Sequence, residues 1–424
     1  MRLLLTFLLF TAFLISDTFT VASYNVENLF DMERNGHEYP EYLPNQHNWN
    51  QRTLQQKLTN ISEVICDLNA DMIGLQEIEN QNALKLLQKS LRDYGCYYPH
   101  YAISQTKQSA IQVALLSKIP IQSSQDIIVS RVGGVRDILE VKVTIANNPL
   151  YLYINHWNSK RSPESKRMRS AKALVNRLRS LPHSTEYILL GDFNSDYNEY
   201  LTIEPQHNDT TGKTGINHIL ETIAEDQALV HECAISSSNH QHYNLWLELP
   251  IYQRWSHNFY GNKQGLDAIV IPGSMMDGKG IDYLNDSFTV FKKSYLFHTK
   301  GYIYRWEYRK KRHTRKGYSD HLPVMASFST QPYQRANCTI SNTTIEQLTH
   351  QVTLSFPLRL QQVDVVKSEK NKVTLQDQSG KDIEVFGIDM PLHLHHRYDL
   401  IVYQRNYYQD RYEIVDYSIE KSYD

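Results

Sequence analysis

The chain has 424 residues, which is long enough for two or three domains. Its composition is that of an ordinary globular protein. Its formal net charge of -2 is too small to indicate any one class of binding partner. Tyrosine is common, with 29 residues, which suggests many half-buried positions or stacking surfaces.

An apolar run opens the chain. Arg2 precedes an almost wholly apolar segment over residues 3–15, and a polar break follows at Ser16. This pattern is typical of a secretory signal peptide, and the run is shorter than the ~20 apolar residues that a membrane-spanning helix needs. We therefore predict a signal peptide over residues 1–16 and a secreted or periplasmic protein without a stable membrane anchor. The alternative is a buried first strand.

Helices and strands interleave over the next 300 or so residues, as hydrophobic periodicity indicates. Helices are predicted over 49–68, 83–91 and 165–181. Strands are predicted over 19–25, 71–77, 97–103, 111–116, 135–145, 150–155, 187–190, 265–271 and 322–328. Polar residues cluster just after several strands, which indicates an α/β sandwich whose site collects at one end of the strands.

The last 90 or so residues have a different pattern, in which helices are lost. Strands are predicted over 351–356, 360–366, 372–376, 383–386, 398–404 and 412–417, with a hairpin turn at 378–381. Short strands at this spacing fit a small barrel. We predict a catalytic domain over residues 17–330, a boundary near 330–335, and a small all-β domain over 336–424.

The four cysteines have neither a CxxC pattern nor a metal-ligand spacing. Export would permit two disulfides among three connectivities, whereas Cys66, on an apolar helical face, is equally compatible with a buried free thiol. The sequence leaves these alternatives open.

Short polar motifs carry the chemistry, and each follows or ends a predicted strand. They occupy residues 23–28, 75–77, 155–157, 191–195 and 318–324. A hard divalent ion such as Mg²⁺ is held by few carboxylates, so Glu77 and Asp320 are candidate ligands, with Asn25 assisting. Taken together, the motifs predict a metal-dependent phosphodiesterase.

The remaining motif residues suit water activation and proton transfer. Asp192 and Asn194 are two positions apart, so on an extended segment they face the same side. One could orient the water while the other donates to a phosphate oxygen. His156 and His321 are candidates for general acid or base. Each residue taken alone could instead have a purely structural role, Asp192 as a turn residue and His156 as a structural histidine.

These motifs, in this order, resemble those of the endonuclease/exonuclease/phosphatase superfamily, also called the DNase I-like fold, over residues 19–329. The resemblance implies a four-layered α/β sandwich, here followed by the small all-β barrel-like domain. It also implies a role for each motif residue: Asn25 near the metal, Glu77 and Asp320 as ligands, His156 on the phosphate and as an acid, Asp192 and Asn194 in the Gly-Asp-Phe-Asn motif, and Asp267 orienting His321.

One position departs from the pattern of many exported relatives. Gln112 stands near the place of an acidic residue that could orient the counterpart of His156. We therefore expect the acid role of His156 to be less well supported than the proton-transfer role of His321.

Two basic segments favour a nucleic acid substrate. The predicted helix after His156 is rich in cations, among them Arg167. Residues 300–316 interleave aromatic residues with cations, including Arg309, Lys310, Lys311 and Arg312. Such a pattern suits phosphate neutralisation and base stacking, although a solvated charged hairpin is the alternative.

The C-terminal region resembles the small OB-fold barrels appended to exported bacterial nucleases. Such barrels often bind single strands. From residue 335 onward, however, 10 Lys or Arg face 13 Asp or Glu, a net of -3. A structural cap, or a contact with protein or glycan, is therefore the alternative.

We predict an exported, monomeric, divalent-metal-dependent endonuclease that cuts DNA, and RNA as a second substrate, with little sequence preference. Mg²⁺ is the expected cofactor, with Mn²⁺ or Ca²⁺ as alternatives. A sphingomyelinase-like enzyme, or another phosphodiesterase or phosphatase acting on lipid or small phosphoesters, is the second hypothesis. An inactive binding module is the third, and the complete motif set argues against it.

Overall fold

The computed structural model describes residues 18–107, 109–131, 135–224, 228–236, 240–333, 338–369, 372–386 and 392–423. The predicted signal peptide lies outside these residues, as does part of the predicted domain boundary. The described residues build two separate hydrophobic cores, one within residues 19–328 and the other within 345–417. Among the helices formed by the described residues, none has the length and apolar character needed to cross a membrane.

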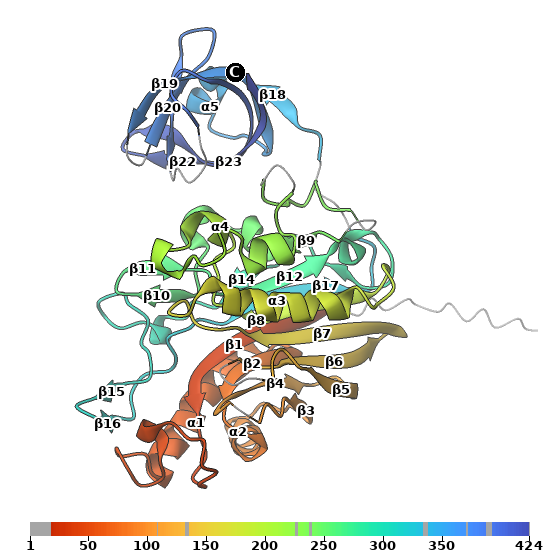
Figure 1. Cartoon of the computed structure of the whole chain (residues 1–424), viewed down its shortest axis with the longest axis vertical. Helices are drawn as coiled ribbons and strands as arrows, with labels where there is room; N and C mark the ends of the chain where they lie inside the picture. Colours follow the sequence, from red (N-terminus) through yellow and green to blue (C-terminus); the bar gives the residue numbers. More distant parts are fainter. Residues whose placement is uncertain are drawn as a thin grey trace, which may run out of the picture.

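Two mixed sheets make up the centre of the described N-terminal part (Figure 1). The first sheet has the strand order β13 (Asp282–Tyr283), β17 (Val324–Ser329), β1 (Thr18–Leu29), β2 (Met72–Ile78), β4 (Gln112–Ser117) and β3 (His100–Ile103), and β14 (Thr289–Val290) pairs with β17. The second has the order β5 (Ile121–Ile127), β6 (Ile138–Ile145), β7 (Asn148–His156), β8 (Glu186–Asp192), β12 (Asp267–Pro272) and β9 (His242–Asn244).

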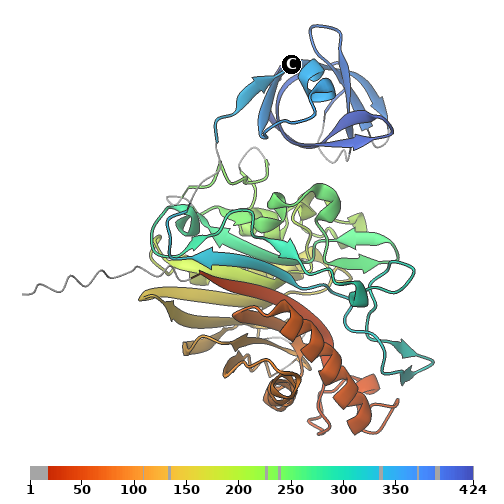
Figure 2. The same cartoon turned by 180° about the vertical axis from the view of Figure 1, so that it is seen from behind.

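Helices cover the outer faces of the two sheets. α1 (Gln51–Leu68) and α2 (Gln81–Tyr94) lie on the outside of the first sheet (Figure 2), and α3 (Glu164–Leu178) with the π-helix η3 (Gly215–Ile219) lies on the outside of the second. The side chain of Asn50 caps α1 by accepting the Thr53 N–H, and the helix ends at Asn69, where φ is 52°. The result is a four-layered α/β sandwich, which confirms the predicted fold class.

The two sheets lie close together at Gly74 in β2. A Cβ atom at this position would lie 2.9 Å from a methyl group of Leu190 in β8 and 3.3 Å from Ile154 in β7. Interiors are close-packed, so a side chain here would force the sheets apart. Gly74 therefore sets the local spacing between the sheets.

Short elements fill the connections. The helical turns are η1 (Pro40–Tyr42), α4 (Glu199–Thr202), η2 (Pro205–His207), η4 (Leu245–Glu248), η5 (Ile251–Gln253), η6 (Gly273–Met276) and η7 (Ser294–Leu296). Two small hairpins, β10 (His257–Phe259) with β11 (Asn262–Gln264) and β15 (Tyr308–Arg309) with β16 (Arg312–His313), project on the same side of the sandwich (Figures 1 and 2).

The C-terminal residues form a barrel with its own core. Its elements are β18 (Ser341–Thr343), α5 (Ile345–His350), β19 (Leu358–Glu369), β20 (Lys372–Gln376), β21 (Asp382–Phe386), β22 (Arg397–Tyr408) and β23 (Arg411–Tyr423). Within the described part, β19, β20, β21, β23 and β22 pair in turn, and the β19–β22 pairing closes the barrel. The predicted small all-β barrel is thus confirmed.

Two details of the C-terminal prediction are wrong. Residues 351–356 are described and form no strand, and the helix α5 precedes them. Thr344 and Gln347 begin this helix with a capping box, in which each side chain accepts from the backbone of the other. Local capping thus produced a helical turn where the apolar pattern alone indicated only strands.

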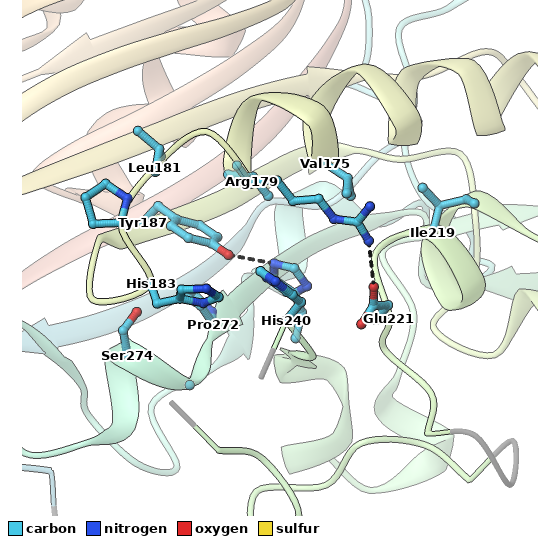
Figure 3. A pocket seen from close by; sticks show the side chains of 14 residues that line it. Val175, Arg179, Leu181, His183, Tyr187, Ile219, Glu221, His240, Pro272 and Ser274 are labelled. Carbon is cyan, nitrogen blue, oxygen red and sulfur yellow. Dashed lines mark hydrogen bonds and ion pairs between the residues drawn. The ribbon is translucent and has the colours of Figure 1, made fainter. Parts of the chain in front are cut away.

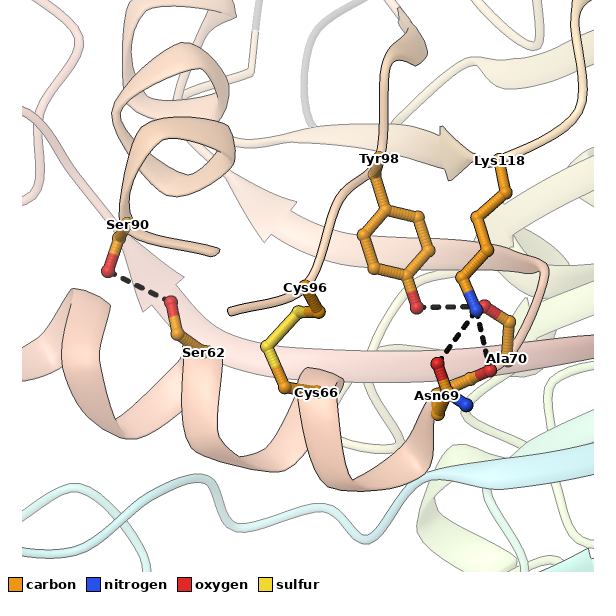
Figure 4. Close-up of a disulfide and its surroundings, with 8 residues drawn as sticks. All are labelled: Ser62, Cys66, Asn69, Ala70, Ser90, Cys96, Tyr98 and Lys118. Carbon is orange, nitrogen blue, oxygen red and sulfur yellow. Dashed lines mark hydrogen bonds between the residues drawn. A yellow bond between two sulfur atoms is a disulfide. The ribbon is translucent and has the colours of Figure 1, made fainter. Parts of the chain in front are cut away.

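All four cysteines form disulfides, so the alternative of a free thiol at Cys66 is wrong. Cys66 on α1 pairs with Cys96, which follows α2 (Figure 4). Ser62 and Ser90 join the same two helices by a hydrogen bond of 2.9 Å. Cys233 pairs with Cys338 and so ties the N-terminal part of the chain to the segment that leads into the barrel.

Side chains also join the barrel to the sandwich. Arg254 forms a buried ion pair with Asp416 of β23, at 2.7 Å. The rings of His231 and Tyr403 stack with their centroids 3.5 Å apart. The barrel therefore has a specific contact with the sandwich in addition to the disulfide.

Candidate active site

The predicted catalytic residues meet at one end of the sandwich. β7 and β8 are parallel neighbours, so His156 and Asp192 at their carboxyl ends lie side by side. Asp267 begins β12, antiparallel to β8, and pairs in register with Asp192. A cavity of about 400 Å³ is lined by the side chains that converge here, among them Glu77, His156, Asp192, Asn194, Asp320 and His321.

Asn25 links the carboxylates of the two sheets. Its Nδ2 donates to Glu77 Oε1 and to Asp192 Oδ2, each at 3.1 Å. Gly191 allows β8 to reach this position, because φ is 139° and a Cβ atom would lie 2.1 Å from the Asn155 carbonyl oxygen. The site is therefore assembled from both sheets at once.

The carboxylates are buried close to one another, and this shifts their pKa values. Burial raises the pKa of Asp192 to about 7, and the nearby Asp267 adds to the effect. Burial and the charge of Asp320 raise the pKa of Glu77. Asp320 differs, because His321 and Arg305 outweigh its burial and lower its pKa. Like charges held this close call for a compensating cation.

The donor atoms fit a divalent metal. The ligand atoms of Asp192, Asp267 and His321 lie within 4.8 Å of one another, as do those of His257, Asp320 and His321. Asp267 Oδ1 is buried and has no hydrogen-bond partner among the described residues. The group of Asp192, Asp267 and His321 offers two carboxylate oxygens, the kind of ligand that hard cations prefer. The arrangement can hold a divalent metal, and the predicted ligands Glu77 and Asp320 both line the same cavity.

His321 is held in one orientation by Asp267. Its Nδ1 lies 2.7 Å from Asp267 Oδ2, which also accepts a hydrogen bond from Ser256 Oγ at 2.6 Å. Its Nε2 lies 3.9 Å from Asp192 Oδ2. Although burial disfavours the charged ring, Asp267 and Asp192 raise the pKa of His321 well above its usual value. The Nδ1 proton is thus fixed, and Nε2 is the atom that faces the site.

His156 is held differently. Its Nε2 lies 3.5 Å from Asp192 Oδ2 and 3.8 Å from Glu77 Oε1, while its Nδ1 is buried without a partner among the described residues. Burial and the cation of Arg136 lower its pKa well below the usual value. Gln112 bonds instead to Ser104 and Thr106. A neutral ring at 156 suits a hydrogen bond to phosphate better than proton donation.

Asn194 departs from the expected geometry. Its φ is 48°, so the chain turns after Asp192, and the two side chains are not alternate positions of one extended segment. The Asn194 N–H donates to Asp192 Oδ1 at 2.8 Å, and its Nδ2 donates to the Trp157 carbonyl at 3.1 Å. Both residues still line the cavity, but Asn194 braces Asp192.

Arg167 lines the catalytic cavity, as its predicted role in substrate binding requires, but its charge is already compensated within the fold. Its side chain is fully buried, and its guanidinium is paired with Glu164 and Glu199. Two further cations of this segment are also paired, Lys160 with Asp196 at 2.9 Å and Arg177 with Glu140 at 2.6 Å. Part of the basic character of this segment is therefore used inside the fold, while Arg161, Arg169 and Lys172 are exposed.

The other predicted cations form the exposed tip of the β15–β16 hairpin. Lys310 and Lys311 make its two-residue turn, with φ of 48° and 58°. Arg309 pairs with Glu307 at 2.9 Å, and Arg312 is exposed. None of the four lines the catalytic cavity, so the structure places them beside the site and not within it.

Two residues at the site carried no assigned role in the sequence. The guanidinium of Arg305 pairs with Glu27 and lies 3.2 Å from Asp320 Oδ2. The ring of His257 lies 4.8 Å from that of His321. Arg305 stands inside the basic aromatic segment, which gave a signal for it. His257 belongs to no motif and comes to the site only through folding.

Another cluster of histidines lies elsewhere, at the beginning of β8 (Figure 3). His183 and His240 have ring centroids 4.7 Å apart, and Tyr187 bonds to His242 at 2.9 Å. They line a small cavity of about 30 Å³. Because β8 begins at Glu186 and ends at Asp192, this cluster is separated from the catalytic residues by the length of the strand.

The sandwich with metal-compatible carboxylates at its strand ends defines a class of phosphoester hydrolases. A family model described as "Endonuclease/Exonuclease/phosphatase family" matches residues 20–330. The chain belongs to this family, whose members are generally metal-dependent phosphodiester hydrolases, and the predicted resemblance is confirmed. Among proteins with curated descriptions, none matches the sequence.

Several solved structures are similar to this chain. D. rerio TDP2 complexed with a single-strand DNA product has 15% identity and a TM-score of 0.46, over 73% of this chain and 98% of that chain. Truncated TDP2 from Caenorhabditis elegans has 14% identity and a TM-score of 0.44, over 73% and 97%. A family protein from Bacteroides thetaiotaomicron has 15% identity and a TM-score of 0.43, over 74% and 99%.

Proposed function

We propose that the protein is an exported, divalent-metal-dependent endonuclease that cuts DNA, and also RNA, with little sequence preference. The observation that carries this proposal is the Asp267–His321 pair, in which Nε2 of His321 lies 3.9 Å from Asp192 of the second sheet and 4.0 Å from Asp320, just before β17 of the first. We propose Mg²⁺ as the metal, with Mn²⁺ or Ca²⁺ as substitutes. A monomer with a cleaved signal peptide completes the proposal.

The site residues divide the chemistry between them. Glu77, Asp320 and Asn25 would hold the metal, which when bound offsets negative charge on the phosphate. Asp267 keeps the Nδ1 proton of His321 in place, so that Nε2 moves a proton at the reacting oxygen. Asp192, 3.9 Å from that nitrogen, is placed to orient the attacking water.

Hydrogen-bond donors hold the phosphate. The neutral His156 donates from Nε2 toward the same space as Asp192. Arg305 is exposed at the rim, with its guanidinium already oriented by Glu27. Donors fixed before the substrate arrives need no reorganisation during the reaction. This arrangement supports hydrolysis of a phosphodiester.

Two observations bear on the kind of substrate. The hairpin tip with Lys310, Lys311 and Arg312 supports a polyanion such as nucleic acid. The tip of the β10–β11 hairpin supports the second candidate, a sphingomyelinase-like enzyme, because Phe259 and Tyr260 are 46% and 96% exposed. Exposed aromatic residues on a hairpin could enter a membrane surface. Lys300, Arg305 and Arg309 line the same groove as these two rings, and their charges favour nucleic acid.

We propose that the barrel is an OB-fold-like cap. The closed barrel, with β21 and β23 paired in parallel, supports this class of fold. The acidic balance of the C-terminal residues disfavours a role in binding a single strand. Its buried ion pair with Arg254 supports a structural role.

Plasmid nicking tests the proposed activity. Purified protein is incubated with supercoiled plasmid, with sphingomyelin and with a chromogenic phosphodiester, each with Mg²⁺, Mn²⁺, Ca²⁺ or EDTA. We expect nicking that EDTA abolishes. His321→Ala should remove it, whereas His183→Ala, in the histidine cluster at the other end of β8, should retain it. No nicking with any metal would refute the nuclease, and hydrolysis of sphingomyelin alone would establish the second candidate.

A further inference from the structure

A large groove of about 930 Å³ lies next to the catalytic cavity. Most of its lining comes from three segments: the tip of the β10–β11 hairpin, the turn at residues 298–301, and residues 302–309 leading into the β15–β16 hairpin. The rest of the lining is Glu27, Asn28, Glu41, Tyr42 and His313. Phe259 and Arg305 line both this groove and the catalytic cavity. The groove is therefore a continuation of the site and not a separate hollow.

Exposed aromatic rings face this groove from two of these segments, the β10–β11 tip and residues 302–309. Phe259, Tyr260, Tyr302 and Tyr308 are 46%, 96%, 43% and 41% exposed. The rings of His298 and Tyr302 are stacked, with centroids 4.6 Å apart and planes 7° from parallel. Exposed rings gathered around one groove mark a binding surface, because burying them would be favourable. Aromatic faces stack on planar groups, so the ligand that they fit is planar.

The charge of the groove suits a ligand that carries phosphates. Arg305 neutralises Glu27, and Arg309 neutralises Glu307 at 2.9 Å, so two of the carboxylates that line the groove are compensated. Lys300 adds a further cation on the wall. The exposed cations of the β15–β16 tip, which follow Arg309 directly, add to the positive charge at this end.

Arg305 occupies the junction of the two hollows. Its Nε donates to Glu27 Oε1 at 2.9 Å, and Glu27 Oε2 accepts the Trp306 N–H at 2.9 Å. The side chain of Arg305 is nevertheless 56% exposed. A guanidinium that Glu27 and Asp320 hold in place, and that is still more than half exposed, is suited to bind a phosphate because it is already oriented.

We propose that this groove binds a short single-stranded stretch of the nucleic acid substrate. Unpaired bases stack on Tyr260, Tyr302 and Tyr308, and the phosphate next to the scissile one lies on Arg305. A duplex keeps its base faces stacked inside, so these rings select unpaired nucleotides. This inference rests on the proposed nuclease function and narrows its substrate to nucleic acid with a single-stranded segment at the site.

Binding to the inactive full-length chain tests the groove. Fluorescence anisotropy of labelled oligothymidylate is measured with His321→Ala protein, alone and combined with Tyr260→Ala or Tyr302→Ala. We expect each tyrosine change to raise the Kd roughly fivefold or more, since each stacked base contributes on the order of a kcal/mol or more. Tyr97→Ala, an exposed tyrosine that lines neither hollow, is the matched control and should leave the Kd unchanged. A duplex of the same length should bind more weakly than the single strand.

Cleavage by the active chain separates failure of the groove from failure of the proposed function. Tyr260→Ala and Tyr302→Ala should raise KM for the oligonucleotide and leave cleavage of the chromogenic diester unchanged. Retained cleavage with unchanged Kd and KM would overturn the groove and leave the nuclease standing. No cleavage of any nucleic acid would overturn both. If Tyr260→Ala and Tyr302→Ala lost binding to sphingomyelin vesicles and kept binding to the oligonucleotide, these rings would instead be a lipid-binding surface.

Discussion

At the scale of single residues, buried carboxylates outside the site also carry shifted pKa values. Glu248, in η4, accepts the Tyr283 hydroxyl at 2.6 Å, but its Oε1 is buried without a partner among the described residues. Burial raises its pKa from 4.5 to about 8. The folded protein therefore binds a proton at Glu248 more tightly than the unfolded chain does.

This shift predicts that Glu248→Gln increases the stability of the folded protein at high pH. The pKa is higher in the folded state, so the stability contributed by this group is complete below about pH 4.5 and is lost as the pH rises toward 8. The neutral amide avoids that loss. We expect the variant to be more stable than the native protein at pH 8, by on the order of 2 kcal/mol. Urea unfolding at pH 5 and pH 8 measures this difference, and an equal effect at both would contradict it.

At the scale of elements, the β15–β16 hairpin has a common two-residue turn made of uncommon residues, two lysines. Both residues of its turn, Lys310 and Lys311, have positive φ, which costs on the order of 1 kcal/mol or more for a side chain other than glycine or asparagine. Strained backbone is common at functional sites. The presence of lysine at both positions is therefore consistent with a role for the charges themselves.

Neutralising the tip should weaken binding of a polyanion. With Arg309, Lys310, Lys311 and Arg312 changed to glutamine, we expect slower DNA cleavage at low salt. The slope of log rate against log salt should flatten by roughly 0.7 to 0.9 for each phosphate that the hairpin no longer neutralises. Cleavage of the chromogenic diester should be spared.

The control for this change is a pair of exposed lysines on α2. Lys85→Gln with Lys89→Gln removes charge from the outer face of the first sheet, away from the site. Its salt dependence should match that of the native protein. Equal loss of activity on DNA and on the small diester in the tip variant would count against a binding role for the hairpin.

Most elements that place the site could be predicted from the sequence, because their signals are local. α1 and β2 follow from their periodicity, and the motif carboxylates from their position at strand ends. Burial of Arg167 and arrival of His257 could not be predicted, because each depends on segments distant in the chain. Pairing of the cysteines likewise depends on which helices pack together.

At the scale of the whole molecule, the contact between the sandwich and the barrel depends on few groups. Arg254 donates to the carbonyls of Leu247 and Leu249 as well as to Asp416. Its guanidinium also packs over the ring of Tyr197, five residues beyond Asp192. The barrel thus supports the segment that follows the Gly-Asp-Phe-Asn motif.

Removing the partner of Arg254 should loosen the barrel. Asp416→Ala leaves a buried guanidinium without its carboxylate, at a cost of about 3–5 kcal/mol. We expect a lower Tm and faster proteolysis between the sandwich and the barrel, most of all after reduction of the Cys233–Cys338 disulfide. Asp364→Ala breaks a surface pair with Arg397 and should lower the Tm far less, because exposed pairs are screened by solvent. Similar effects of the two changes would argue against a docked barrel.

The close approach at Gly74 has a consequence for catalysis. Gly74 lies three residues before Glu77 on one sheet, and its neighbour Leu190 lies two residues before Asp192 on the other. The distance between Glu77 and Asp192, the two carboxylates that share Asn25, is therefore set by the Gly74–Leu190 contact, which contains no reactive atom. In the proposed reaction the rate of hydrolysis depends on the fit between the two sheets, because each sheet supplies one of the two carboxylates.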